Sequence, residues 1–528
     1  MSSVSLYDTT LRDGMQGEGL SLSAEEKLRV AKRLELLGVD YIEAGFPSSN
    51  PKEIELFNLL GEAPLQASKV AAFGMTRRRD MAAADDGGLQ VLAASPVPAA
   101  TIVGKTWLLH LEKVVKVDRN ENLAMICESS SYLVGAGKEV IYDAEHFFDG
   151  FRDDPGYALE CLRSAASGGA SWLVLCDTNG SSLPREIAEA VDAVVQEFGG
   201  AVGIGIHCHN DLGCGVANSL AAVEAGATQV QGTMNGIGER TGNANLVSIA
   251  ANLELKMGIK CLPEGNLATL TEVSHFIDEI CNRVPNPHQP FVGRSAFAHK
   301  GGMHVAGVME DSRTFEHIDP ALVGNQRELL LGELSGKGTV LARAADLGLV
   351  LDDELAAAII EQVKEKEHRG YHYEAAEGSL ELLLRREAGA FEPLFELESW
   401  RVIVEKRADG NVETEATVKV FVDGERHVST AEGNGPVNAL DRALRAAIGR
   451  VHSDLENIDL INFKVRILDE SRGTQSVTRV LLDATDGHDV WGTIGVSPNV
   501  IEASWEALVD SLEYGLHSVR SSESGSRA

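Results

Sequence analysis

The first half of the chain repeats a strand-like segment followed by a helical segment, and this alternation constrains the fold more than any other feature. Short apolar runs stand at residues 4–8, 41–45, 69–74, 139–143, 172–177, 202–207 and 229–235, with one more near 89–93 or 101–104. Helical patterns lie between them, and in the one at 23–37 Ser23 and Glu26 form a capping-box signature. About eight such strands are what a closed parallel α/β barrel requires.

Polar side chains stand at the ends of many of these strands: Asp8, Glu43, Glu145, Asp177, Thr178, Asn179, His207 and Asn235. In a closed barrel the carboxyl ends of all strands lie on one face, where enzymes of this architecture carry their active sites. A doubly wound open sheet is the alternative, but it gathers its polar ends at one switch point and not around a ring. We therefore predict a TIM (β/α)8 barrel over residues 1–280.

Two histidines, His207 and His209, follow the apolar run at 202–206. Residues two apart on a strand point to the same face, so both imidazoles can reach one ion. Asp13, in Asp-Thr-Thr-Leu-Arg-Asp-Gly at 8–14, can add an anionic oxygen. A His-x-His pair alone is more often structural, but a strand end that feeds a helix favours the ligand interpretation. Two imidazoles and one carboxylate leave coordination positions free, as a catalytic metal needs.

Composition limits the classes of partner. The chain has 528 residues and a net charge of −32, which argues against nucleic acid because phosphate binding needs a basic patch. The sequence has no apolar stretch of membrane length and no charged-then-apolar leader at its start. Seven cysteines without a Cys-x-x-Cys pair indicate reduced thiols. We expect a cytoplasmic protein without membrane or nucleic-acid partners.

A glycine-rich segment, Gly-Ile-Gly-Glu-Arg-Thr-Gly-Asn at 236–243, superficially resembles a dinucleotide-binding fingerprint. Its third glycine falls out of the G-x-G-x-x-G register, and a nucleotide-binding unit more naturally opens a domain than closes a run of eight strands. We interpret the segment as a loop that carries Glu239, Arg240 and Asn243 to the mouth of the barrel.

Three motifs together resemble the signatures of the pyruvate carboxyltransferase-like metal-dependent TIM-barrel superfamily. They are Asp-Thr-Thr-Leu-Arg-Asp-Gly-Met-Gln at 8–16, His-Cys-His-Asn-Asp at 207–211 and the glycine-rich segment at 236–243. This superfamily includes 2-isopropylmalate, homocitrate and citramalate synthases and 3-hydroxy-3-methylglutaryl-CoA lyases. Segments 295–304 and 331–337 resemble the synthases' linker subdomain, so the resemblance covers nearly the whole chain. Lyases of the superfamily generally end soon after the barrel, so the chain length favours a synthase.

Within the synthases, segments 137–150 and 299–305 resemble the longer type of bacterial and archaeal citramalate synthases. This resemblance implies condensation of acetyl-CoA with pyruvate to (R)-citramalate, the first step of a threonine-independent isoleucine pathway. A 2-isopropylmalate synthase, which uses 2-oxoisovalerate, is the alternative, followed by a metal-dependent aldol-type lyase. A noncatalytic amino-acid sensor would not need to keep Asp13, His207 and His209 together.

The expected chemistry begins with a 2-oxo acid whose carbonyl is polarised by a divalent ion (Zn, Mn or Mg) on Asp13, His207 and His209. The resemblance implies that Asn243 lies in or next to the coordination shell. It also implies that Arg12 stabilises the alkoxide formed at the keto carbon and that Thr178 binds the substrate carboxylate. The alternative for Arg12 is a structural salt bridge, and for Asp177 the alternative is only a cap on the following turn.

Acetyl-CoA must lose a methyl proton, which calls for a base with a pKa near neutrality. The match to the linker histidine of the synthases makes His304 the expected base, with Glu145 orienting it or acting through water. His299 and Glu239 are the alternatives. Phe315 stands where relatives carry a tyrosine, so any help that the tyrosine gives to thioester hydrolysis must come here from another group or from water.

The last part of the chain repeats a pattern of three strands and a helix. Strands at 401–405, 416–423 and 425–429 precede a helix at 437–448, and strands at 463–469, 478–484 and 489–493 precede a helix at 501–515. Turns at 433–437 and 495–500 contain glycine and proline and offer backbone N–H groups to a carboxylate. A plain dimerisation domain would have the same pattern. The resemblance to the synthases' allosteric domain implies a homodimer with amino-acid feedback, isoleucine being the expected inhibitor.

The expected organisation follows from these patterns. The barrel at 1–280 is followed by mostly helical linker subdomains at 281–395 that contribute to the active site. An α+β allosteric or dimerisation domain of two βββα units occupies 396–517. The polar tail at 518–528 is expected to be disordered.

Overall fold

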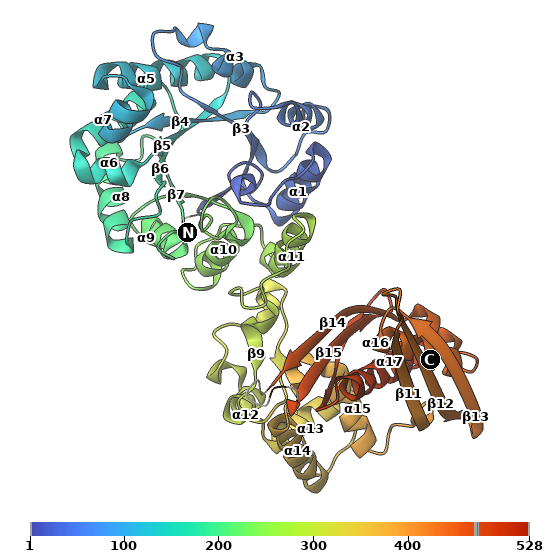
Figure 1. Ribbon diagram of the computed structural model, residues 1–528. Helices are drawn as coiled ribbons and strands as arrows, with labels where there is room; N and C mark the ends of the chain where they lie inside the picture. The colour runs from blue at the N-terminus through green and yellow to red at the C-terminus, as the bar shows by residue number, and fades with distance from the viewer. Residues whose placement is uncertain (1–2, 469–472, 474, 526–528) are drawn as a thin grey trace. The chain divides into compact units, whose positions relative to one another are not determined.

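The computed structural model describes residues 3–468, 473 and 475–525. Within these residues, eight parallel strands close into a barrel, in which β1 pairs with β2 on one side and with β8 on the other (Figure 1). This confirms the predicted TIM barrel. The strands are β1 Ser5–Asp8, β2 Tyr41–Gly45, β3 Lys69–Met75, β4 Ala99–Lys105, β5 Glu139–Glu145, β6 Trp172–Asp177, β7 Gly203–Cys208 and β8 Gln229–Gly232.

Two strand positions differ from the sequence pattern or decide between its alternatives. The fourth strand is Ala99–Lys105, whereas 89–93 lies in helix α3, whose N-cap Asp86 accepts hydrogen bonds from two backbone N–H groups. The last strand, expected to reach 235, ends at Gly232 because Asn235 has a φ of 58°. Asparagine tolerates this left-handed conformation better than most residues, so the chain turns there into the short helix η4 Met234–Gly236.

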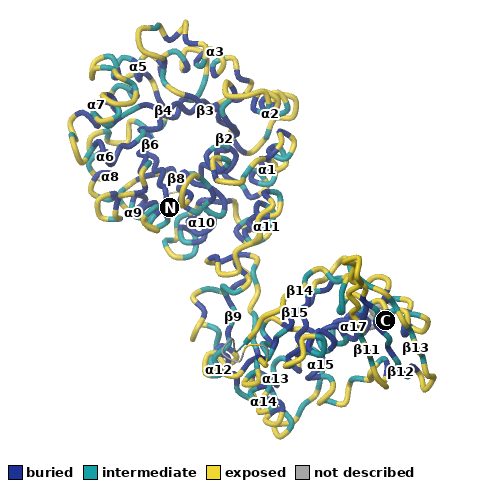
Figure 2. Tube along the Cα trace, viewed as in Figure 1, coloured by how far each residue is buried: buried dark blue, intermediate teal, exposed yellow. Residues whose placement is uncertain are grey.

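Helices cover the outside of the barrel, and Figure 2 shows the strands buried while the outer sides of the helices are exposed. Ser23 caps α1 through the expected capping box with Glu26. The covering helices are α1 Ala24–Leu37, α2 Pro51–Glu62, α3 Gly87–Ala94, α5 Arg119–Gly135, α7 Pro155–Ser167, α8 Pro184–Phe198, α9 Gly215–Glu224 and α10 Leu246–Leu255. Shorter helices lie in the loops: α4 Leu108–His110, the π-helix η3 Leu111–Val115 and α6 Phe147–Asp153, with α11 Leu270–Ile280 after the barrel.

The barrel interior is a packed core below the site. Tyr7, Tyr41, Ile141, Val174 and Cys176 point inward and contact one another, together with two alanines. Their strand neighbours point outward into the larger core between barrel and helices, which buries both faces of every strand. This double burial explains why the strands read as apolar runs, and it leaves the strand ends as the place for polar groups.

The remainder of the chain forms a second compact unit, Ala298–His317 with Glu328–Ala528, while Ile318–Arg327 belongs with the barrel. The helices α13 Lys337–Asp346, α14 Asp353–His368 and α15 Glu377–Glu387 share a core with Ile494 and Val496. The segment 281–395, expected as a separate linker, is therefore divided between the two units. Short amphipathic helices cannot bury their apolar faces alone, which accounts for their packing against the following domain.

The C-terminal domain contains two three-stranded antiparallel sheets, as expected from the repeated pattern. Alternate residues of the central strands, such as Val418, Val420 and Leu482, are fully buried beneath helices, whereas the opposite faces are open. The elements are β11 Glu396–Lys406, β12 Val412–Val422, β13 Glu425–Gly433 and α16 Pro436–Ile448, then β14 Asp459–Ile467, β15 Thr478–Thr485, β16 Val490–Ser497 and α17 Val500–Gly525.

Helix α17 continues to Gly525, so residues 518–525 are helical where a disordered tail was expected. Once a helix is nucleated, each added residue gains one hydrogen bond, and polar residues can extend it beyond its packed turns. Residues 526–528 and the expected strand end at 469 lie outside the described residues. None of the described helices combines the length and the apolar character that crossing a membrane requires.

Candidate active site

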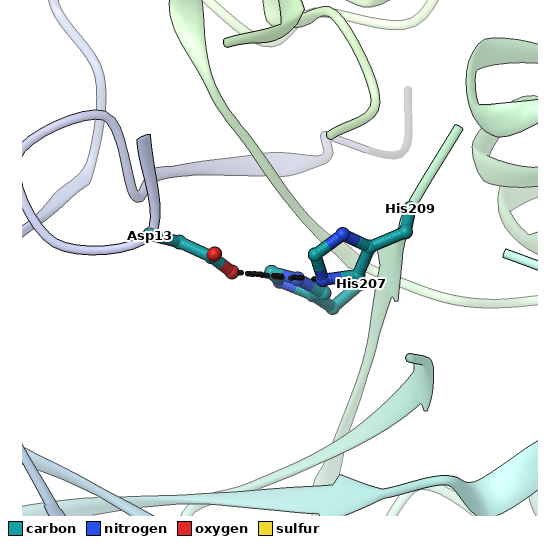
Figure 3. A group of neighbouring side chains, drawn as sticks. All are labelled: Asp13, His207 and His209. Atoms are coloured by element: carbon teal, nitrogen blue, oxygen red, sulfur yellow. Dashed lines mark ion pairs between the residues drawn. The ribbon is translucent and has the colours of Figure 1, made fainter. Parts of the chain in front are cut away.

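Asp13, His207 and His209 meet at the carboxyl ends of the barrel strands (Figure 3). Oδ2 of Asp13 lies 3.2 Å from Nε2 of His207 and 3.8 Å from Nε2 of His209. His207 belongs to β7, His209 follows it directly, and Asp13 precedes the short helix η1 Gly14–Gln16. All three side chains are buried. The structure thus brings together the three ligands that the sequence suggested.

A tight turn after β1 places Asp13. The backbone N–H groups of Arg12, Asp13 and Gly14 all donate to the carbonyl of Thr9, at 3.2, 2.9 and 3.0 Å. Thr10 connects this turn to the segment after the last strand, β8, because its hydroxyl accepts a hydrogen bond from the N–H of Met234 at 2.9 Å. The turn is therefore fixed at both sides of the β1–β8 seam.

The charges of the three groups suit metal binding. Burial alone would raise the pKa of Asp13, but Arg12 and His207 hold it well below its ordinary value, so the carboxyl is ionised. Burial and the neighbouring His207 lower the pKa of His209 to about 4, so this imidazole is neutral at pH 7. Burial also opposes the charged form of His207, yet the hydrogen bond and charge of Asp13 raise its pKa. A cation on Asp13 would compete with that proton.

Arg12 forms a salt bridge and also lines the pocket. Its Nε donates to Oε1 of the fully buried Glu43 at 2.5 Å, and its NH1 lies 3.4 Å from Asp13. The guanidinium lies over the ring of Phe73, 3.9 Å from the centroid. The geometry is therefore compatible both with a structural salt bridge and with a role toward a substrate. The guanidinium is held rigidly, and part of it faces the cavity.

Asn243 lies beside His209 through a backbone bridge between the two residues. Its Nδ2 donates to the carbonyl of Ile237 at 3.2 Å, while its Oδ1 is buried with no hydrogen-bond partner among the described residues. A buried carbonyl oxygen without a partner is costly. Two imidazoles, a carboxylate and this free amide oxygen form a donor set that fits a divalent metal.

Thr178 and Glu145 line the same cavity, which has a volume of about 310 Å³. The hydroxyl oxygen of Thr178 accepts from the N–H of His146 at 2.9 Å, which leaves its proton for a ligand. Glu145 forms an ion pair with Lys105. Asp177 accepts from two backbone N–H groups of the following turn, so it has the capping position foreseen as its alternative role.

The three candidates for the base have different surroundings. His304 lies exposed on α12 Gly302–Glu310 in the second unit and stacks on Phe315, with ring centroids 4.2 Å apart. His299, in the same unit, is buried, and its Nε2 lies 3.2 Å from Glu316. Glu239 is exposed at the mouth of the metal cavity, 3.6 Å from Arg240. His304 stays a prediction.

Sequence reasoning missed two polar residues of the pocket, Lys105 and Asp143, and the buried Gln231 that contacts the pocket residues. Lys105 pairs with Glu145 from the end of β4, the strand that the sequence left undecided. Burial and the nearby Glu43 raise the pKa of Asp143 to about 7. Gln231 contacts both Asp143 and His207. A signal for Gln231 was present, since two glutamines spaced by two on a strand point to the same face, where polar side chains in an otherwise apolar segment stand out.

Gly242 offers a direct test of the loop that carries Asn243. Its φ is 95°, and an added Cβ would lie 1.9 Å from the carbonyl oxygen of Gly236, so Gly242→Ala must displace the loop. We expect metal affinity to fall by about tenfold or more, measured by calorimetric titration of Mn²⁺. Gly213→Ala is the matched control, because Gly213 has a φ of 71° but open space around its Cβ position. Equal affinities for the two variants would contradict a role of the loop in the site.

Comparison with known proteins agrees with this geometry. The HMGL-like family model matches residues 3–277, a homocitrate synthase post-HMGL domain-like model matches 291–370, and the LeuA allosteric (dimerisation) domain matches 374–516. The (R)-citramalate synthase of Aquifex aeolicus is 48% identical over 97% of this chain and 98% of its own length. The enzyme of the same name from Streptomyces coelicolor is 48% identical over 97% and 96%. A probable 2-isopropylmalate synthase from Methanopyrus kandleri is 34% identical over 96% and 97%. The chain therefore belongs to the (R)-citramalate synthase family, whose N-terminal barrel is HMGL-like.

Proposed function

We propose that this chain is an (R)-citramalate synthase that condenses acetyl-CoA with pyruvate and hydrolyses the thioester. The observation that carries the proposal is the open Asp13, His207 and His209 cluster at the barrel mouth of a chain that matches these enzymes over nearly its full length. In the reaction, the methyl carbon of acetyl-CoA loses a proton and forms a bond to the keto carbon. The keto oxygen gains a proton, and water cleaves the thioester to release CoA and a carboxylate.

The pocket residues would bind and activate pyruvate. A divalent ion, Zn, Mn or Mg, held by Asp13, His207, His209 and Asn243 would supply Lewis acidity at the keto group. Arg12 would then stabilise the negative charge that develops on the keto oxygen, because its guanidinium is fixed by Glu43 and Phe73. The hydroxyl of Thr178 would donate to the substrate carboxylate, since its oxygen already accepts from His146.

The proton of acetyl-CoA would be removed by His304. Its exposure supports this role over His299, whose ring nitrogen is already engaged by Glu316. Glu145 would assist through Lys105 or water, because its carboxylate is held by an ion pair at the edge of the cavity. Another group or water would serve where relatives carry the tyrosine that Phe315 replaces.

A thiol-release assay with acetyl-CoA tests the activity and the metal together. We expect CoA release with pyruvate and little with 2-oxobutyrate, 2-oxoisovalerate or 2-oxoglutarate. His209→Ala should lower turnover by at least about 100-fold, because the Lewis acid loses a ligand while the barrel keeps its core. His288→Ala, at an exposed position, is the matched control. A preference for 2-oxoisovalerate would assign the chain to 2-isopropylmalate synthesis, and full activity of His209→Ala would exclude this metal site.

Proton exchange separates the role of His304 from binding. His304→Gln is expected to slow exchange of the acetyl-CoA methyl protons with heavy water by about 100-fold while pyruvate affinity changes little. NMR measures the exchange, and calorimetry measures the binding. His299→Gln distinguishes the alternative base. Normal exchange in His304→Gln with slow exchange in His299→Gln would transfer the role to His299.

The C-terminal domain would bind isoleucine as a feedback inhibitor and dimerise the chain. A cavity of about 430 Å³ lies where α16 begins, lined by Gly435, the N-cap of the helix, by Pro436 and Asn438 from its first turn, and by Leu460 and Phe463 from β14. Backbone N–H groups at the start of α16 suit an amino-acid carboxylate, and the apolar side chains suit an aliphatic group. The match to an allosteric (dimerisation) domain over 374–516 supports regulation of this kind.

Filling this cavity tests the regulatory site. Val437→Trp places a large ring in the cavity, so isoleucine affinity should fall by more than about tenfold while uninhibited activity is kept. Val451→Trp, at an exposed position, is the control. Calorimetry with isoleucine, leucine and valine identifies the effector. Linkage requires that the substrates weaken binding of the effector by the same factor by which the effector weakens binding of the substrates. Undiminished isoleucine binding to Val437→Trp would place the effector elsewhere.

A further inference from the structure

The two metal-site histidines are held differently. Nδ1 of His207 lies 3.0 Å from Oε1 of Gln231, and Nε2 of Gln231 donates to Oδ1 of Asp143 at 3.2 Å. The three side chains come from β7, β8 and β5 and are all buried. By contrast, Nδ1 of His209 is buried without a hydrogen-bond partner in the part of the chain that the structure describes.

The direction in which these hydrogen bonds are donated follows from the group at the Asp143 end. Nε2 of Gln231 faces Oδ1 of Asp143 and donates to it, so the carboxyl group is the acceptor at the end of this chain of hydrogen bonds. The amide carbonyl then faces His207, whose Nδ1 has to carry the hydrogen. With Nδ1 engaged by Gln231, Nε2 is the nitrogen that points to Asp13, 3.2 Å away, and a cation that displaces the proton between them meets a lone pair on Nε2.

We propose that Asp143 and Gln231 are positioning residues that keep a hydrogen on Nδ1 of His207 and so direct Nε2 to the metal site as a ligand. This inference rests on the metal site proposed above and explains how the chain orders that site before a metal arrives. Groups that orient a ligating histidine commonly change metal affinity by about 10- to 100-fold when they are replaced.

The neighbouring Gln229 shows that the pairing of Gln231 is not a general requirement of the barrel. Gln229 stands two residues earlier on β8 and therefore points to the same interior, yet neither amide atom has a partner within the described ranges. The barrel thus tolerates a buried glutamine amide without partners. At position 231 the same side chain is engaged on both sides, by an acid that lines the metal cavity and by a metal-site histidine.

The test measures Mn²⁺ binding to the full-length protein without substrate. Gln231→Leu removes the acceptor for His207, and we expect the affinity to fall by about 10- to 100-fold. The double variant Gln231→Glu with Asp143→Asn exchanges the amide and the carboxylate but keeps both hydrogen bonds. The new amide at position 143 donates to the new carboxylate at position 231, which still accepts from Nδ1 of His207. The affinity of the double variant should stay within about threefold of the unaltered protein. Gln229→Leu is the matched control and should bind Mn²⁺ normally.

NMR of protein labelled with ¹⁵N-histidine reads directly whether Nδ1 of His207 carries a hydrogen in the metal-free state. We expect a hydrogen-bonded Nδ1–H for His207 in the unaltered protein and in the double variant, and loss of this signal through exchange with water in Gln231→Leu. Normal Mn²⁺ affinity in Gln231→Leu, or an Nδ1 without a hydrogen in the unaltered protein, would overturn the inference. Should Gln231→Leu not fold, the NMR result on the unaltered protein decides. Absence of Mn²⁺ binding by the unaltered protein would instead refute the metal site itself, and the inference with it.

Discussion

Closure of the barrel between β1 and β8 is the constraint on which the whole site depends. Asp13 and the two histidines are far apart in sequence, and only the pairing of β1 with β8 and of β8 with β7 brings their loops to one place. Side chains reinforce the seam. The hydroxyl of Thr9 donates to the carbonyl of Gly232 at 3.1 Å, and the Thr10 hydroxyl connects Asp8 with Met234. The site is therefore ordered by backbone pairing before its side chains interact.

The electrostatics of the pocket complement a cation. Three buried carboxyl groups, Asp13, Glu43 and Asp143, face one guanidinium, that of Arg12. Burial in a low-dielectric interior penalises such an excess of negative charge, which is one reason why the pKa of Asp143 is raised to about 7. A divalent ion would favour the ionised forms of these groups. The same excess explains why Arg12 is held so firmly, since each neighbouring carboxylate stabilises its charge.

Local patterns predicted the barrel and its capping box at Ser23, and they singled out Asp13, His207 and His209, which the structure brings together, because alternation and strand-end position depend on residues close in sequence. They could not choose between 89–93 and 101–104, since both segments are short and apolar. They also missed the pairs Lys105–Glu145 and Asp143–Gln231, each of which joins two different strands. Such pairs depend on strand register, and a single sequence does not encode register locally. For the same reason the packing of α13, α14 and α15 against β16 was not foreseen.

We infer that Asp13, His207 and His209 form an open centre that binds the keto group of a 2-oxo acid. Electron paramagnetic resonance of the Mn²⁺-loaded protein with pyruvate, with ¹⁷O in the keto oxygen, tests this binding. Direct coordination predicts broader Mn²⁺ lines with the labelled pyruvate than with unlabelled pyruvate, and loss of this difference in Asp13→Asn. Identical line widths for labelled and unlabelled pyruvate, under conditions where calorimetry shows both bound, would contradict binding of the keto group at this centre.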